Sequence, residues 1–385
     1  MTPAARYSAA IEVLDRVLAG APAEQALTNW GRASRFAGSG DRNAVRDLVY
    51  DALRCRRSYA AFGGAESGRG LMLGGLRAAG IDPATLFTGE GHAPPPVAPG
   101  EEGRVPEGAE ALDLPDWLLA QLTVSLGEDM GAVAQALRQR APVFLRVNLR
   151  RATVAQAIAA LQAEGISAEP HDLSDTALEV TGGARKIQTG QAYLSGLVEL
   201  QDAASQAGVD ALPLRDGMRV LDHCAGGGGK TLAMAARAGL SLFAHDAFPA
   251  RMRDLPARAS RAGARVTLTD RPETLAPFDL ILADAPCSGS GSWRRDPQGK
   301  WALTPERLTQ ICAQQDGILD RVATMVRHGG VLAYATCSLL RVENEGRISA
   351  FLGRTPGWRL LQAHQYTPLS GGDGFFLALL TQEKT

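Results

Sequence analysis

A unit repeated along the second half of the chain constrains the fold most: an apolar strand ends in a polar residue and a helical segment follows. The first unit is a strand from Val220, a loop of four glycines and a helix. Strands alternating with helices predict a parallel, doubly wound α/β sheet, whose ligands bind beyond the carboxyl ends of its strands. Further strands are expected in residues 241–246, 265–270, 278–286 and 331–338, and a further helix over 308–326.

Chemically useful side chains stand at these strand ends, namely Asp246, Asp270, Asp284, Cys287 and Cys337. A single cysteine in an α/β core is usually only a small apolar residue. Two cysteines at neighbouring strand ends, each beside polar residues, instead favour a nucleophilic thiolate. Asp246 follows the glycine loop by about twenty residues, a spacing that suits the ribose diol of NAD or of S-adenosylmethionine.

The glycine loop 226–229 lets backbone N–H groups approach a ligand closely. The loop alone does not choose between a dinucleotide, a phosphate and a tight turn. It is not a Walker A loop, because residue 224, where the leading glycine would stand, is a cysteine.

The first half of the chain predicts smaller domains. Residues 1–88 form a helical bundle, with helices expected over 8–19, from Asp41 onward and over 71–79. Residues 89–111 are rich in proline, glycine and glutamate, which predicts a mobile linker. Residues 112–200 begin with a helix and continue as a small α+β subdomain, with a strand over 143–149, a helix over 154–163 and a strand over 177–180.

Composition excludes several classes of protein. The net charge of −1 conceals an acidic segment, since residues 81–135 carry ten acidic side chains and one basic side chain. The remaining chain is mildly basic, which is compatible with RNA binding. Five widely spaced cysteines without a CxxC pair argue against a disulfide framework and a zinc site. No apolar run reaches the roughly 18 residues of a membrane span, so a cytoplasmic protein is expected.

Three motifs occur in order: CAGGGGKT at 224–231, DAPCSGSG at 284–291 and YATCSLLRVENE at 334–345. Together they resemble the RNA cytosine-C5 methyltransferases, in particular the bacterial Sun/Fmu (RsmB-type) enzymes of small-subunit 16S ribosomal RNA. PVFLRVN at 142–148 resembles the start of that family's RRM-like subdomain, and SGDRNAVRDLVYDALR at 39–54 resembles its NusB-like domain. The resemblance covers most of the chain and is strongest over 190–380.

The resemblance implies a Rossmann-like class I S-adenosylmethionine-dependent methyltransferase domain over 201–385. It implies that Cys337 attacks C6 of the cytosine, Cys287 assists product release, Asp284 contacts the base and Lys230 neutralises charge. The RNA cytosine would be unpaired or flipped out. A monomer that needs neither a metal nor a membrane is expected. The residues implied around the cofactor are Cys224, Ala225, Gly226, Gly227, Gly228, Gly229, Lys230, Asp246, Asp270 and Asp284.

The chain departs from the family at three places. Gly227 replaces the family's usual proline, which loosens the glycine loop, and RRDPQ at 294–298 replaces an RRHPD-like stretch. The acidic linker stands where later helices of the NusB-like domain are usual. A transfer-RNA methyltransferase and a non-enzymatic RNA-binding scaffold remain alternatives, whereas an NAD dehydrogenase would need a catalytic histidine or Tyr-Lys pair that is not evident.

Overall fold

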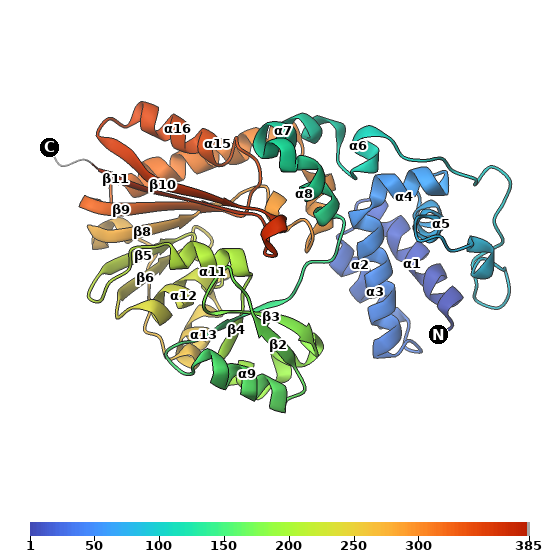
Figure 1. Ribbon diagram of the computed structural model, residues 1–385, viewed down its shortest axis with the longest axis horizontal. Coiled ribbons are helices and arrows are strands. Elements are labelled where there is room, and N and C mark those ends of the chain that lie inside the picture. The colour runs from blue at the N-terminus through green and yellow to red at the C-terminus, as the bar shows by residue number, and fades with distance from the viewer. Residues whose placement is uncertain (383–385) are drawn as a thin grey trace. The chain divides into compact units, whose positions relative to one another are not determined.

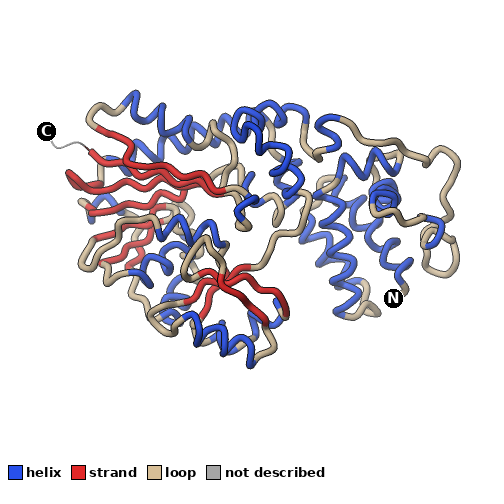
Figure 2. The backbone as a smooth tube through the Cα atoms, in the orientation of Figure 1, coloured by secondary structure: helices blue, strands red, loops and turns tan. Residues whose placement is uncertain are grey.

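The computed structural model describes residues 1–382, which form two compact units (Figure 1). Unit 1 comprises residues 1–140 together with residues 293–303, and unit 2 comprises residues 141–292 and the chain from Thr304 onward. All strands of the described chain belong to unit 2, as the colouring of Figure 2 makes clear. No helix in residues 1–382 combines the length and apolar character needed to cross a membrane.

Unit 1 is helical and is built around an apolar core to which α1, α2, α3 and α5 contribute buried side chains. The second and fourth helices add to the three that the sequence pattern predicts. Thr2 caps α1, and Ser67 caps α5 through the N–H of Gly70. The helices are α1 (Pro3–Leu18), α2 (Ala23–Ala33), α3 (Ser39–Arg54), α4 (Arg56–Gly63), α5 (Gly68–Ala78), α6 (Gly108–Ala111), α7 (Asp116–Leu126), α8 (Met130–Leu137) and α14 (Pro297–Ala302), with 3-10 turns at Pro83–Thr85 and Gly127–Asp129.

Residues 112–140, which the sequence analysis groups with the α+β subdomain, belong to unit 1 in the structure. A fully buried carboxylate, Asp113, explains this assignment. It accepts hydrogen bonds from the backbone N–H and hydroxyl of Ser58 at 2.8 and 2.7 Å, and it pairs with Arg138 at 2.8 Å. Buried polar contacts of this kind link α4 to the segment around α7 and α8.

Residues 293–303, which contain RRDPQ, also belong to unit 1 although they follow the DAPC motif. Gln298 donates to the carbonyl of Ala21 and accepts from the N–H of Ala23. Lys300 is buried and donates to the carbonyl of Arg54, and Trp301 donates to that of Leu53. Burial lowers the pKa of Lys300 to about 8. In this chain the stretch therefore anchors α14 to the helical unit.

The acidic segment has no regular secondary structure over residues 89–107, but within unit 1 it is hydrogen-bonded to α5. Arg69 pairs with Glu101 at 2.6 Å and donates to the carbonyls of Pro95 and Pro96. Arg77 donates to the carbonyl of Glu101. The hydrogen bond from Arg69 lowers the pKa of Glu101 to about 2. Charged and backbone hydrogen bonds thus attach part of this segment to α5, and the expected mobility of residues 89–111 stays a prediction.

Unit 2 begins with a four-stranded antiparallel sheet in the order β2-β3-β1-β4, packed on α9. Thr153 and Gln156 form a capping box at the start of α9, which begins and ends where the sequence pattern predicts. The elements are β1 (Phe144–Val147), α9 (Val154–Ala163), β2 (Ser167–Pro170), β3 (Ala177–Gly182), α10 (Gln191–Leu194) and β4 (Val198–Leu200).

The large sheet of unit 2 has seven strands in the order β10-β11-β9-β8-β5-β6-β7. The five strands from β9 to β7 are parallel, as the sequence predicts, but β11 pairs antiparallel with both β9 and β10. The elements are α11 (Ala203–Asp210), β5 (Arg219–His223), α12 (Gly229–Arg237), β6 (Ser241–His245), α13 (Leu255–Ala262), β7 (Thr267–Leu268), β8 (Phe278–Asp284), α15 (Pro305–Ala323), β9 (Val326–Thr336), α16 (Glu345–Arg354), β10 (Trp358–Tyr366) and β11 (Phe375–Gln382).

Helices cover both faces of this sheet (Figure 1). Alternate residues of β8 point to opposite faces, so Leu280 and Leu282 join a core with α11 and α12. Ile281 and Ala283 join a second core with α15 and α16. Strands buried on both sides hold their carboxyl ends rigidly at one edge of the sheet, which is where the candidate site lies.

Candidate active site

The carboxyl ends of β5, β6, β8 and β9 meet at one edge of the large sheet. His223 lies opposite both His245 and Ala283 in the strand register, and Asp284 lies opposite Ala335. The residues that follow these positions are therefore neighbours in space. The parallel pairing thus gathers the glycine loop, Asp246, the DAPC motif and the TCS motif.

The two strand-end cysteines lie side by side, with 3.2 Å between the Sγ atoms of Cys287 and Cys337. The hydrogen bond from Cys287 lowers the pKa of Cys337, whereas the same contact and burial raise the pKa of Cys287 well above 9.0. The contact allows either sulfur to donate, and the two pKa directions favour Cys337 as the thiol that loses its proton first. The nucleophilic form of a cysteine is the thiolate, so the same directions favour Cys337 over Cys287 for that role.

Glu343 ties the two cysteine-bearing loops together. This fully buried carboxylate accepts from the hydroxyls of Ser288 and Ser338, both at 2.5 Å, and from the N–H of Ser288 at 2.8 Å. Gln315 on α15 donates to it and to the carbonyl of Pro286. Glu343 lies within the YATCSLLRVENE motif, but the sequence pattern assigned it no role. The available signal was an acid three residues after an apolar Leu-Leu pair near a strand end.

Lys230 and Asp284 form an ion pair beside the cysteines, with 2.6 Å from Nζ to Oδ2. Burial lowers the pKa of Lys230, but the charge and hydrogen bond of Asp284 raise it further, so the ammonium form persists. Lys230 also acts electrostatically on Cys337, whose pKa it lowers. The structure therefore brings together all four residues that the sequence analysis names as catalytic.

The glycine loop and Asp246 form one structure. The carboxylate of Asp246 is buried and accepts from the N–H of Gly226 at 3.0 Å and of Phe248 at 2.8 Å. Cys224, Gly226 and Gly228 have φ values of 74°, 51° and 81°. A Cβ at Gly226 would meet nothing within 4 Å, so the loop opens onto free space there. Such a loop fits a ligand that needs close backbone approach, such as a nucleoside cofactor.

Asp270 lies farther along the same edge, after β7. It lines a hollow of about 340 Å³ together with Pro249, Met252 and Leu268. Arg253 and Thr269 also line it, and this mixture of apolar side chains with a few polar groups suits a flat heterocycle such as adenine. Burial raises the pKa of Cys224 to about 12, so this thiol is neutral and does not compete with Cys337 as a nucleophile.

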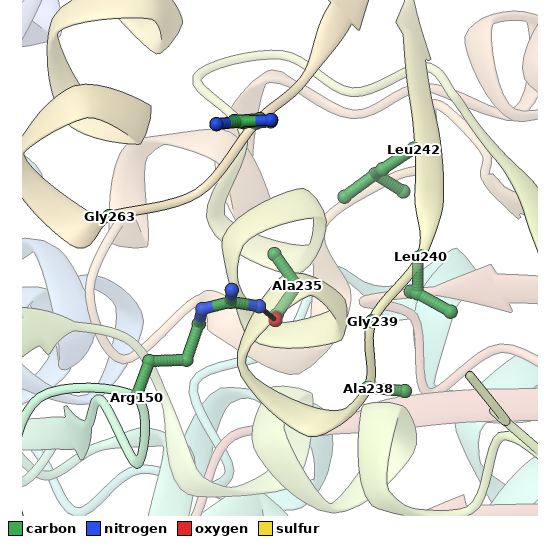
Figure 3. A pocket seen from close by; sticks show the side chains of 8 residues that line it. Arg150, Ala235, Ala238, Gly239, Leu240, Leu242 and Gly263 are labelled. Atoms are coloured by element: carbon green, nitrogen blue, oxygen red, sulfur yellow. Dashed lines mark hydrogen bonds between the residues drawn. The ribbon is translucent and has the colours of Figure 1, made fainter. Parts of the chain in front are cut away.

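A second hollow, of about 350 Å³, lies at the opposite edge of the sheet (Figure 3). Leu240 and Leu242 line it at the start of β6, and Arg150 reaches the carbonyl of Ala235 at 2.9 Å. None of the residues that the sequence analysis singles out lines this hollow. Within residues 1–382 no group of three or more His, Cys, Asp or Glu is placed to hold a metal ion, and all five cysteines are free thiols.

Comparison with known proteins places these motifs in a family. Residues 209–381 match the model for the 16S rRNA methyltransferase RsmB/F, and residues 114–186 match the ferredoxin-like domain of RsmF/B-like methyltransferases. The four-stranded sheet and α9 lie largely within the second match. Together the two matches cover the candidate active site and the subdomain that precedes it.

Curated relatives agree with this placement. The chain is 34% identical over 286 residues to ribosomal RNA small subunit methyltransferase B of Yersinia pestis bv. Antiqua (strain Angola), and likewise to that of Yersinia pseudotuberculosis serotype O:1b. The alignment covers 70% of this chain and 66% of each relative, so the chain spans just under two thirds of the relatives' length.

Solved structures show the same fold. The crystal structure of PH0851 matches with a TM-score of 0.78 at 22% identity over 99% of each chain. A methyltransferase homolog from Pyrococcus horikoshii matches with a TM-score of 0.61 at 25% identity over 71% of this chain and 96% of that chain. NSun6 from the same organism, solved with SFG, gives 0.62 at 18% over 71% and 99%. On its two family matches and its curated relatives, this chain belongs to the RsmB/F methyltransferase family.

Proposed function

We propose that this protein transfers a methyl group from S-adenosylmethionine to C5 of a cytosine in RNA, with small-subunit 16S ribosomal RNA as the substrate and the cytoplasm as its place of action. The observation that carries the proposal is the pair of thiols 3.2 Å apart, in which the pKa of Cys337 is lowered. The names of the curated relatives support the ribosomal substrate. The solved neighbour that holds SFG, an analogue of S-adenosylmethionine, supports the cofactor.

The cofactor would be held by the loop from Cys224 to Gly229, with Asp246 beside its ribose and Asp270 at the adenine hollow. S-adenosylmethionine supplies an electrophilic methyl group on a sulfonium sulfur. Gly226 faces open space, so the loop backbone can come close to the ligand. The chain's own contribution is to place and orient this methyl group.

Cys337 would add to C6 of the cytosine, which makes C5 nucleophilic enough to accept the methyl group. Asp284, held by Lys230, would hydrogen-bond the N3/N4 edge of the base. A solvent base would then take the C5 proton, the C5–H electron pair would restore the C5=C6 double bond, and the C6–S bond would break with its electron pair returning to the sulfur of Cys337. The thiol of Cys287 faces that sulfur and would stabilise it as it leaves.

A methyl-transfer assay with labelled S-adenosylmethionine tests the proposal directly. Purified 16S ribosomal RNA and purified transfer RNA are offered separately, and bisulfite sequencing then locates any 5-methylcytosine. Label in 16S RNA supports the proposal. Label only in transfer RNA would move the substrate, and RNA binding without label would favour the scaffold alternative.

A further inference from the structure

Two carbonyl groups of the glycine loop accept hydrogen bonds from arginines of unit 2. Arg258 on α13 donates from Nη1 to the carbonyl of Gly227. Arg146 on β1 donates from Nη1 to the carbonyl of Gly229 at 3.4 Å. Glycines bring no side chains that could fix the loop, so these contacts restrict a backbone that would otherwise be free.

The arginines cluster around one buried carboxylate, Glu199 on β4, which is only 2% exposed. Its Oε2 accepts from Arg258 at 2.9 Å and its Oε1 accepts from Arg261 at 2.5 Å. Arg146 lies opposite Glu199 in the register of β1 and β4. Because Arg258 and Arg261 stand three residues apart on α13, one carboxylate can hold both guanidinium groups and so fix the helix.

The helix that Glu199 fixes touches the loop at two consecutive glycines. A Cβ at Gly228 would lie 2.2 Å from Cδ1 of Leu255, the first residue of α13. A Cβ at Gly227 would lie 3.1 Å from Nη1 of Arg258. The loop therefore contacts α13 directly at Leu255 and Arg258, and the side chain of Arg258 is the one that donates to a loop carbonyl.

We infer that Arg258 is a positioning residue for the cofactor loop. Glu199 orients its guanidinium group, which fixes the carbonyl of Gly227 and thereby the N–H groups of the loop. This inference rests on the proposed binding of S-adenosylmethionine by the same loop. In this loop Gly227 replaces the family's usual proline, and the side chain of Arg258 supplies a restraint on the backbone that a proline ring would supply.

Arg261 provides a matched control, because it shares Glu199 with Arg258 but makes no contact with a loop carbonyl. If the cluster serves only stability, Arg258→Ala and Arg261→Ala should behave alike. If Arg258 positions the loop, Arg258→Ala alone should weaken cofactor binding. Arg258→Lys is the conservative variant: a single ammonium group cannot serve the carboxylate and the carbonyl as a planar guanidinium does, so partial recovery is expected.

The experiment measures S-adenosylmethionine binding by calorimetry, hydrogen exchange of the loop amides in the cofactor-free protein, and the thermal midpoint of each full-length variant. Arg258→Ala should raise the Kd about tenfold, the size expected when one hydrogen bond to a charged group is lost. It should also speed exchange at residues 226–229, and methylation at saturating cofactor should remain near wild type. Arg261→Ala should leave the Kd and the loop exchange unchanged.

Equal Kd values and equal loop exchange for the two alanine variants would overturn the inference. If Arg258→Ala does not fold, the lysine variant decides, since wild-type loop exchange in a folded Arg258→Lys protein would equally overturn it. Failure of the wild-type protein to bind S-adenosylmethionine would instead refute the proposed function. Loop exchange in the cofactor-free protein would still report on the contact between Arg258 and Gly227.

Discussion

The ends of β8 and β9 carry the same side chain, a half-buried cysteine, but they shift its pKa in opposite directions. Cys287 and Cys337 lie 3.2 Å apart, yet the pKa of Cys287 is raised and that of Cys337 is lowered. Their mutual hydrogen bond is the leading cause of both shifts. Glu343 raises the pKa of both thiols, and at Cys337 Asp284 raises the pKa whereas Lys230 lowers it. The contact between the two thiols, more than the identity of the residue, therefore separates their pKa values.

The largest effect is expected from replacing Cys337, which tests whether this cysteine rather than Cys287 is the nucleophile. Cys337→Ala should reduce methyl transfer by at least about 10³-fold, as removal of a nucleophile commonly does. It should also give no protein–RNA adduct, because no thiolate remains to add to C6. A denaturing gel and the labelled-methyl assay read both outcomes. Substantial activity in this variant would mean that the β8 end carries the nucleophile or that the reaction is not covalent.

The second change separates the roles of the two thiols. Cys287→Ala should still form the adduct but resolve it slowly, because the leaving sulfur of Cys337 loses its hydrogen-bond donor. Turnover should fall by about 10²-fold, a loss typical for one proton-handling group, while complexes that survive denaturation accumulate. Cys312→Ala on α15 is the control and should behave as wild type. Adducts in Cys337→Ala and none in Cys287→Ala would exchange the two roles.

A substitution of Lys230 tests how far its positive charge contributes to the difference in pKa between Cys287 and Cys337. Lys230→Met removes the cation that lowers the pKa of Cys337, so that pKa should rise and the thiolate should form at higher pH. Methylation near neutral pH should fall by about tenfold, the consequence of a shift of one pKa unit. The pH dependence of Cys337 alkylation, followed by mass spectrometry, should move upward, whereas the exposed Lys186→Met variant should match wild type. An unmoved profile would show that the hydrogen bond from Cys287 alone sets the difference.

A substitution at the end of a third strand, β6, should not affect the two thiols. Asp246→Ala removes the acceptor for the N–H groups of Gly226 and Phe248 and should weaken S-adenosylmethionine binding by about 1–3 kcal/mol. Alkylation of Cys337 should be unchanged. Asp216→Ala is a matched control, because Asp216 also accepts a backbone N–H, that of Gly239, but at the other edge of the sheet. Calorimetry that finds unaltered affinity in Asp246→Ala would remove this residue from the cofactor site.

Sequence patterns predicted much of this architecture because they are local. Alternating strands and helices predicted the five parallel strands, and the bounds of α9 follow from its capping residues and apolar spacing. The same patterns overlooked α2, α4 and the antiparallel β10 and β11. A strand such as β11 is apolar throughout, and its direction depends on the neighbour with which it pairs.

The sequence by itself determined the parallel core of unit 2 and the order of its strand-end residues, since apolar periodicity and motif spacing are properties of the chain alone. Only the tertiary structure decided that the two thiols meet and that their pKa values shift in opposite directions, because the leading cause is the contact between two cysteines fifty residues apart in the chain. It also decided that residues 89–107 are hydrogen-bonded to α5 through Arg69 and that residues 293–303 join unit 1. These outcomes depend on hydrogen bonds between residues far apart in the chain, whose partners no local pattern reveals.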